Sequence, residues 1–554
     1  MQSHLTSTRP QRDTLDPARA WLVRLALPAT AIAAALALTA GSAEAKPTSR
    51  VSAQIKHGTL IVNGSRKDDN LALRVRAATP NTLDIDVGDN GSADIKVRRS
   101  AFQRIVVQGR DGRDRIRIDD AEVVFTDTTP TTLDGGPGAD TLLGGRAAET
   151  FLGGSGRDFV DANGGNDVAF LGRGDDRFQW DPGDGSDVVE GQQARDELLF
   201  NGSGAAESFD VSANGQRVRF FRDVGAITID LDDVEKVTTN ALGGADTMTV
   251  NDLSGTDAQE IRTDLAGVLG GTTGDAQTDR LIVNATDAAD TIAVKGAAGA
   301  VDVTGLSAKV ALTRAEAAGD TVTVNSLGGT DTVDASGTAA NTLAAVALNG
   351  GDLDDVLIGS AGKDALDGDR GNDVALMGAG DDTFTWDPGD GSDTVEGQSG
   401  ADTLRFNGAA VAEKFDVSAN GRRVRFTRDV GAITMDLDDV ENVTTNALGG
   451  ADTITVNDLT GTDLTAVDVD LAGVLGGKGG DGQVDRVIAN ATNGPDAITV
   501  AGANGTVEVT GLPAAIGITN AEATDELVVN GLGGADSFET AGLAPGTISL
   551  STVQ

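Results

Sequence analysis

Along most of the chain, hydrophobic and polar residues alternate in short runs of four to six positions. Examples are RVRF at 217–220, AITID at 226–230 and DTITV at 452–456, and Gly, Asn and Asp stand between such runs. A period of two with turn-forming residues between the runs is typical of β-strands. Helical spacing is nearly absent: DLDDVE at 230–235 and LTRAEA at 312–317 allow one short turn each. The sequence therefore predicts an all-β fold.

Two glycine-rich blocks, residues 131–200 and 341–406, repeat a nine-residue unit. Acids recur nine positions apart, at Asp140, Glu149, Asp158, Asp167 and Asp176, and at Asp355, Asp364, Asp373 and Asp382. After a two-residue insertion the spacing resumes at Asp187 and Asp196, and at Asp393 and Asp402. The residue two positions after each acid is apolar: Leu142, Phe151, Val160, Ala169, Phe178, Val189, Leu198, Leu357, Leu366, Ala375, Phe384, Val395 and Leu404. Each unit is expected to be a six-residue turn and a short strand with one inward-pointing side chain.

This spacing predicts where the carboxylates lie in a β-solenoid. If two units form one coil, acids eighteen apart lie on the same edge, about 4.8 Å from one another. The expected partners are Asp140, Asp158 and Asp176 on one edge, Glu149 and Asp167 on the other, Asp355 with Asp373, and Asp364 with Asp382. At an effective dielectric of about 20, two bare carboxylates at this distance repel by roughly 3.5 kcal/mol, and a cation between them removes that repulsion. Carboxylate and carbonyl oxygens without Cys or His ligands favour Ca²⁺ over transition metals.

A second, looser repeat occurs five times outside the blocks, and each copy is called a module here. A module opens with a β-rich run that ends in Asn and closes with a turn that contains Asp. The pairs are Asn63 with Asp114, Asn201 with Asp246, Asn284 with Asp331, Asn407 with Asp452, and Asn490 with Asp536. The Leu-Gly-Gly turns that end in Asp246, Asp331, Asp452 and Asp536 fit either a degenerate calcium turn or a tight turn between strands.

The second half of the chain duplicates the first. Residues 158–308 match residues 364–514 without a gap, at an offset of 206. The predicted organisation is a signal peptide at 1–45, a diverged module at 46–130, a glycine block at 131–200, two modules at 201–340, a second block at 341–406 and two modules at 407–554. Units too small to bury a face alone must stack on their neighbours.

The N-terminal segment predicts export. Arg19 and Arg24 precede an apolar run from Leu25 to Ala40, and Ala43-Glu44-Ala45 supplies small residues before a cleavage site. The run is shorter than the roughly 20 residues that span a bilayer, and no later stretch resembles a transmembrane segment. We expect a secreted, extracellular protein cleaved after Ala45. The C-terminus has no hydrophobic tail to anchor it, so we expect the protein to be released or held non-covalently.

Composition limits the functions that are available. A formal charge of −42 argues against binding to nucleic acid or anionic membranes. The chain has no Cys, and after the predicted cleavage His57 is its one histidine. Thiol nucleophiles, His-based triads and HExxH zinc sites are therefore excluded. Because no segment outside the repeats is long enough for a catalytic domain, we expect a protein that is not an enzyme.

The blocks resemble a known family. GGPGADTLL, GGSGRDFVD and NGGNDVAF are similar to the GGxGxDxUx nonapeptide of RTX, or haemolysin-type, calcium-binding repeats, where U is a large apolar residue. The resemblance implies a parallel β-roll in which Asp side chains and turn carbonyls hold Ca²⁺ between successive turns. It implies as ligands Asp140, Asp158, Asp167, Asp176, Asp355, Asp364, Asp373 and Asp382. The turn with Glu149 and Ala147 departs from the pattern, and Gly351-Asp352-Leu353 disturbs the unit of Asp355.

Three functional hypotheses follow from the sequence. The first is an exported calcium-binding repeat protein whose β-rolls fold and rigidify on Ca²⁺, with a structural or surface and matrix role. The second is an adhesin-like protein in which calcium stiffens a rod and the modules bind a glycan or a cell, so that a cell-surface or matrix polysaccharide is a candidate partner. The third is a polysaccharide-acting enzyme that uses a pair of carboxylates.

Overall fold

The computed structural model describes residues 50–554, which form one compact unit. The predicted signal peptide lies outside the described residues. Within them the regular structure is β-strand, apart from two single-turn 3₁₀ helices, η2 (Arg99–Ala101) and η3 (Val430–Ala432). No helix of this part of the chain is long and apolar enough to cross a membrane.

The strands form two sheets, called sheet A and sheet B here, and sheet A has 23 strands. In order of pairing, its first strands are β1 (Ser52–Lys56), β2 (Thr59–Asn63), β6 (Arg104–Gln108), β8 (Thr131–Pro137), β10 (Glu149–Ser155), β12 (Val168–Arg173) and β14 (Val188–Gln193). The next are β18 (Ile227–Asp232), β17 (Arg217–Arg222), β16 (Ser208–Asn214), β20 (Thr247–Val250), β22 (Arg280–Asn284), β26 (Thr321–Asn325), β28 (Ala345–Asp352) and β30 (Asp364–Arg370). The last are β32 (Thr383–Trp386), β34 (Thr403–Asn407), β38 (Asn442–Asn446), β40 (Ala466–Asp470), β44 (Ala515–Thr519), β43 (Thr506–Thr510), β42 (Ala497–Ala503) and β46 (Ser537–Glu539).

Sheet B runs alongside and begins with β5 (Ile95–Arg98), β4 (Thr82–Val87), β3 (Asn70–Val75), β7 (Arg115–Asp119), β9 (Thr141–Leu143), β11 (Phe159–Asp161), β13 (Arg177–Trp180) and β15 (Glu197–Asn201). It continues with β19 (Lys236–Asn240), β21 (Glu260–Asp264), β25 (Lys309–Thr313), β24 (Ala300–Thr304), β23 (Thr291–Ala297), β27 (Thr332–Thr338), β29 (Val356–Ile358) and β31 (Val374–Leu376). Its last strands are β33 (Thr394–Glu396), β37 (Ile433–Asp438), β36 (Arg423–Arg428), β35 (Lys414–Asn420), β39 (Thr453–Val456), β41 (Arg486–Asn490), β45 (Glu526–Asn530) and β47 (Ser549–Val553). Within residues 50–554, β5 and β47 each pair with a single strand, so sheet B is open at both ends.

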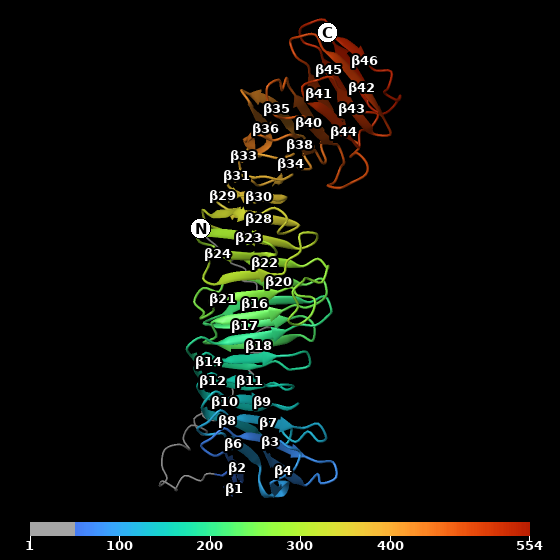
Figure 1. Cartoon of the computed structure of the whole chain (residues 1–554). Helices are drawn as coiled ribbons and strands as arrows, with labels where there is room; N and C mark the ends of the chain where they lie inside the picture. Colours follow the sequence, from blue (N-terminus) through green and yellow to red (C-terminus); the bar gives the residue numbers. More distant parts are fainter. Residues whose placement is uncertain (1–49) are drawn as a thin grey trace, which may run out of the picture. The chain divides into compact units, whose positions relative to one another are not determined.

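The glycine blocks are coiled as a parallel β-roll. Consecutive strands alternate between the sheets, with β8, β10 and β12 stacked in sheet A and β9, β11 and β13 in sheet B (Figure 1). Phe151 pairs with Leu133 on one side and Ala169 on the other, a register of eighteen residues per coil. The predicted all-β fold with parallel β-roll blocks is confirmed.

The interior of the roll is filled by the apolar residue that follows each acid by two positions. All thirteen of these side chains are buried, at 0–1% exposure. The two-residue insertion lengthens one coil to twenty residues, so that Ala169 pairs with Val189. Trp180 fills the interior beside this insertion: it is fully buried, stacks on Phe200 at 4.1 Å between ring centroids and donates from Nε1 to the carbonyl of Gly185.

Each module adds an antiparallel three-stranded meander to the stack. In the first module after block 1, β16, β17 and β18 pair antiparallel in sheet A, while β18 pairs in parallel with β14 and β16 with β20. The same arrangement recurs at β23–β25, β35–β37 and β42–β44, and β3–β5 form a meander in the diverged module. The parallel coil therefore continues through the modules, and the division of the chain into six segments stays a prediction.

Candidate metal sites along the carboxylate ladders

The predicted ligand residues form hydrogen-bonded rows along the edges of the roll, called ladders here. In each ladder the backbone N–H of one acid donates to Oδ1 of the acid one coil further on. Asp140 donates to Asp158 at 2.7 Å, and Asp158 donates to Asp176 at 2.6 Å. On the other edge, Glu149 donates to Asp167 at 2.6 Å.

The second block repeats this geometry. Asp355 donates to Asp373 at 2.7 Å, and Asp364 donates to Asp382 at 2.7 Å. The acids that were expected to share an edge therefore do so in both blocks. Because Oδ1 is engaged in this way, the other carboxylate oxygen decides what else the ladder can bind.

Seven of the eight predicted ligands have a buried Oδ2 with no hydrogen-bond partner among residues 50–554. They are Asp140, Asp158, Asp167, Asp176, Asp355, Asp373 and Asp382. Their side chains belong to residues that are 1–2% exposed, so bulk water does not solvate this oxygen. We call it the free oxygen. Buried polar atoms in folded proteins are nearly always paired, so a repeated row of free oxygens points to a bound partner.

Asp364 is different because its turn supplies donors of its own. The backbone N–H of Ser360 donates to Oδ2, and the Ser360 hydroxyl donates to Oδ1 at 2.8 Å. The pairs Ser65 with Asp69, Thr286 with Asp290 and Thr492 with Asp496 are built in the same way. A Ser or Thr four positions before the acid therefore satisfies the carboxylate from within the protein.

The backbone conformation four positions before the acid distinguishes two classes of turn. In one class Oδ2 is free, and in the other a Ser or Thr donates to the carboxylate. Four positions before each of the seven acids with a free oxygen stands a residue with a left-handed φ, for example Gly154 at 112° before Asp158. The corresponding Ser and Thr residues do not have a left-handed φ within residues 50–554. At Asp140, Asp158, Asp355 and Asp373 a glycine one position earlier leaves space for the carboxylate: a Cβ on Gly153 would lie 2.9 Å from Oδ2 of Asp158. Where both positions are glycine, the first makes room for the free oxygen, and the second takes the turn conformation that L side chains rarely adopt.

Burial makes these carboxyl groups reluctant to ionise. It raises the pKa of Asp158 to about 7 against the lowering effect of the Asp140 N–H, with further raising by the neighbouring Asp176 and Asp140. Burial likewise raises the pKa of Asp167 to about 9, with repulsion from Asp187 and Glu149 adding to it. The pKa values of the others are raised chiefly by burial to about 6 for Asp140, Asp176, Asp355 and Asp364, about 7 for Asp382 and about 8 for Asp373. The ladder is thus a column of partly desolvated acids that a cation would stabilise in the ionised form.

These residues fit a calcium ion. The free oxygens are hard ligands, a glycine lies beside four of the seven, and the ladders contain neither Cys nor His. Seven Asp side chains together with turn carbonyls are therefore able to hold Ca²⁺.

The two turns that depart from the pattern each keep one carboxylate oxygen without a partner among the described residues, and they differ in the donor to the other oxygen. Glu149 accepts the N–H of Gly145 at 2.9 Å and keeps Oε1 without a partner among the described residues. Asp355, whose turn is disturbed, is as buried as Asp373 and has the same free oxygen. Leu353 stands where the pattern has a glycine and takes a left-handed φ of 83°, with its side chain 60% exposed.

The ladders include acids that the sequence-based ligand set omits. Asp187, Asp196, Asp393 and Asp402 continue them, and Asp114 and Asp331 precede them, each with a free oxygen among the described residues. The nine-residue spacing that resumes after the insertion could have been used to predict Asp187, Asp196, Asp393 and Asp402 as ligands. Asp114 lacks a glycine pair, so the nonapeptide pattern does not single it out.

Three groups of acids outside the ladders also bring possible ligand atoms within 4.8 Å of one another in the described part of the chain. They are Asp161 with Asp181 and Asp184, Asp232 with Asp233 and Asp257, and Asp438 with Asp439 and Asp463. Burial raises the pKa of Asp184 to about 7, and Asp161 and Asp181 add to this effect. Their residues are half-buried or exposed, so solvent screens them more than it screens the ladders.

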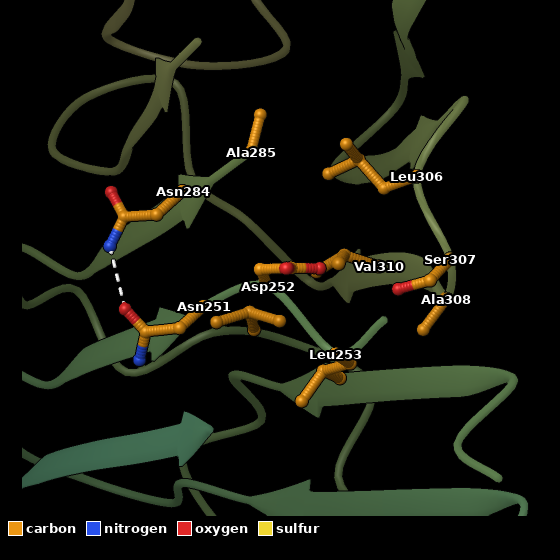
Figure 2. Close-up of a pocket in the computed structure, with 10 residues that line it drawn as sticks. Asn251, Asp252, Leu253, Asn284, Ala285, Leu306, Ser307, Ala308 and Val310 are labelled. Carbon is orange, nitrogen blue, oxygen red and sulfur yellow. Dashed lines mark hydrogen bonds between the residues drawn. The ribbon is translucent and has the colours of Figure 1, made fainter. Parts of the chain in front are cut away.

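A small pocket in the first pair of modules offers no comparable site. Figure 2 shows Asn251 and Asn284 on one side of it and Leu306, Ser307 and Ala308 on the other. Asn284 donates to Asn251 at 2.8 Å, within a ladder of Asn side chains that links neighbouring coils. The cavity of about 10 Å³ has room for one water molecule, not for a substrate.

Comparison with known families agrees with the geometry. The family described as the RTX calcium-binding nonapeptide repeat matches four segments, residues 132–148, 143–178, 349–384 and 388–408. The chain carries RTX calcium-binding nonapeptide repeats. All eight predicted ligands lie within the RTX segments, as do Asp393 and Asp402.

Among solved structures, the chain is similar to the extracellular lipase LipA from Serratia marcescens. The match has 13% identity and a TM-score of 0.15, and it covers 60% of this chain and 42% of the lipase chain. No curated protein matches the sequence. The prediction that the chain is not an enzyme is contradicted by the lipase comparison, since a protein similar to it is an enzyme. At this TM-score the similarity does not assign lipase activity to the chain.

Proposed function

We propose that this RTX repeat protein is exported, and that its β-roll becomes stable and rigid when Ca²⁺ binds to the ladders. The observation that carries the proposal is the row of buried free oxygens, which recurs in both blocks. An ion that binds only the folded state stabilises that state. The stabilisation is large when the carboxylate ligands repel one another in the absence of the ion.

The proposed ligands are the seven aspartates with a free oxygen, together with carbonyl oxygens of the glycine turns. Asp364 is a weaker candidate, because Ser360 already donates to both of its oxygens. The metal supplies positive charge between coils, and the protein's own groups supply the spacing, the exclusion of water and the hydrogen bonds that orient each carboxylate.

Export is supported by the sequence of residues 1–45. Extracellular calcium modules usually have dissociation constants of about 10⁻⁴ to 10⁻³ M. At such affinities the protein is unloaded inside a cell and loaded outside it. Determination of the N-terminal sequence of the secreted protein tests this part: a first residue of Lys46 agrees with it, and retention of the chain in the cell contradicts it. We propose a structural role at a surface or in a matrix for the loaded form.

Calcium-linked folding is tested on the chain from Lys46 by far-UV circular dichroism and thermal melting, in Ca²⁺ and in chelator. We expect Ca²⁺ to raise the melting midpoint and the β signal, because the ion neutralises buried charge. The triple variant Asp158→Asn, Asp167→Asn, Asp176→Asn should lose most of the response of block 1. A melting midpoint that is the same in Ca²⁺ and in chelator contradicts the proposal.

A further inference from the structure

The carboxylate ladder continues in the modules, outside the segments that match the RTX family. The N–H of Glu207 donates to Oδ1 of Asp246 at 2.8 Å, and the N–H of Asp246 donates to Oδ1 of Asp279 at 2.7 Å. In the second half, Glu413 donates to Asp452 at 2.8 Å and Asp452 donates to Asp485 at 2.8 Å. The Leu-Gly-Gly turns of these modules therefore place their acids as the glycine blocks do.

Asp246 and Asp452 also carry the free oxygen. Their residues are 3% and 1% exposed, and Oδ2 of each has no hydrogen-bond partner within residues 50–554. Four positions earlier, Leu242 and Leu448 have left-handed φ values of 71° and 64°. A leucine in this conformation is sterically strained. The two turns nevertheless have the left-handed conformation found in the turns whose Oδ2 is free, although neither position is a glycine.

Further acids lie close to the free oxygen of Asp246. Glu207 is neutralised by the buried side chain of Arg222, with which it forms an ion pair. Asp275 already accepts the N–H groups of Gly244 at 2.7 Å and Gln277 at 2.8 Å, and its charge remains close to Asp246. Burial raises the pKa of Asp246 to about 8, and Asp279, Glu207 and Asp275 add to the rise.

We propose that Asp246 and Asp452 each bind one hard divalent cation, with the free oxygen as a ligand and the neighbouring Asp279 and Asp485 carboxylates sharing its charge. A tight turn between strands needs none of this, because an Asn side chain would accept the same ladder hydrogen bond without burying a charge. The ion is identified as Ca²⁺ only through the proposed function of the glycine blocks, on which this part of the inference rests.

The chain contains a matched control for these two positions. Asp290 and Asp496 occupy the same kind of ladder position and donate to the next acid, Asp331 and Asp536. Their carboxylates, however, are already satisfied by Thr286 and Thr492. Replacing this pair removes the same two charges from the modules without removing a free oxygen.

The test is equilibrium dialysis of the chain from Lys46 with radioactive Ca²⁺, which counts the ions bound per chain at saturation. The double variant Asp246→Asn, Asp452→Asn should bind two ions fewer than the parent, and each single variant one fewer. The double variant Asp290→Asn, Asp496→Asn should bind as many as the parent. Circular dichroism in saturating Ca²⁺ verifies that each variant is folded like the parent before ions are counted.

The outcomes separate this inference from the proposed function. If the Asp246 and Asp452 variant binds as many ions as the parent while the block triple variant binds fewer, the inference is wrong and the proposed function stands. If the Asp290 and Asp496 control variant loses as many ions, the loss results from removing negative charge in general and not from removing a free oxygen. The inference is then also wrong. A parent chain that binds no Ca²⁺ overturns both.

Discussion

Replacing Asp158 by Asn separates the two roles of a ladder carboxylate. The amide oxygen of Asn still accepts the Asp140 N–H, which lies 2.7 Å from Oδ1 in the native ladder. The amide nitrogen takes the place of the free oxygen, so the buried charge and the metal ligand disappear together. We therefore expect the substitution to stabilise the protein in chelator and to destabilise it in Ca²⁺.

The size of the effect follows from the raised pKa. Burial raises the pKa of Asp158 from 3.8 to about 7, so the folded state binds this proton more tightly than the unfolded state. Stability is then lost as pH rises from about 4 to about 7, and at pH 8 the whole cost is present. A shift of about three units corresponds to roughly 4 kcal/mol. Leaving the amide hydrogens unpaired costs about 1–3 kcal/mol, so a net gain of about 2 kcal/mol in chelator is expected.

The assay is urea unfolding at pH 8, followed by circular dichroism and by amide hydrogen exchange in β10 and β12. Hydrogen exchange is needed because a stacked-repeat protein opens locally, and the effect should be concentrated near Asp158. In chelator the variant should show slower exchange there than the parent, and in saturating Ca²⁺ the order should reverse. A variant that is less stable than the parent in both conditions refutes the reasoning, because the carboxylate would then be stabilising without an ion.

Four other predictions use the same geometry. In chelator, the urea midpoint of the parent should fall as pH rises from 4 to 8, because the ladder carboxyl groups hold protons in the folded state; a rising midpoint would contradict the raised pKa values. Ser360→Gly should add one bound Ca²⁺ per chain in equilibrium dialysis, because it removes the hydroxyl that donates to Oδ1 of Asp364 and permits the left-handed φ at which Oδ2 is free in the other turns. An unchanged count would contradict the two-class description of the turns. Gly153→Ala should weaken calcium binding in a calorimetric titration, because its Cβ would clash with the carbonyl oxygen of Leu171 and lie 2.9 Å from Oδ2 of Asp158; unchanged affinity would show that the cradle is not needed. Phe151→Ala should lower the stability of block 1 by about 3–5 kcal/mol in hydrogen exchange, since this fully buried side chain fills the roll, and a much smaller loss would place the core elsewhere.

The coil of the glycine blocks was predictable because each unit repeats two independent signals. The acid and the apolar residue two positions later fix which side chain turns inward, and the nine-residue spacing fixes which acids share an edge. Phe151 between Leu133 and Ala169, and Asp158 between Asp140 and Asp176, follow directly from this register.

The modules were less predictable, because alternation identifies a strand without identifying its partner. The runs at β16, β17 and β18 are evident in the sequence, but their antiparallel pairing inside a parallel stack is not. The difference between Asp364 and Asp382 depends on a single residue, Ser360, whose backbone conformation the nonapeptide pattern does not specify.

The exclusion of an enzyme failed for a different reason. Absence of Cys, together with a single His after the predicted cleavage, rules out the mechanisms that need those side chains. It does not rule out chemistry carried by carboxylates or hydroxyl groups, in which this chain is rich. Composition excluded particular mechanisms, and the prediction rested on the further assumption that catalysis needs a separate domain outside the repeats.

The most direct test of the calcium ladder is a calorimetric Ca²⁺ titration of the chain from Lys46, compared with the triple variant Asp158→Asn, Asp167→Asn, Asp176→Asn. The ladder geometry predicts saturable binding of several ions per chain, a higher melting midpoint at saturation and a smaller stoichiometry in the variant. A parent that binds no calcium, or a variant that binds as much as the parent, would contradict the central claim that the buried free oxygens hold the ion.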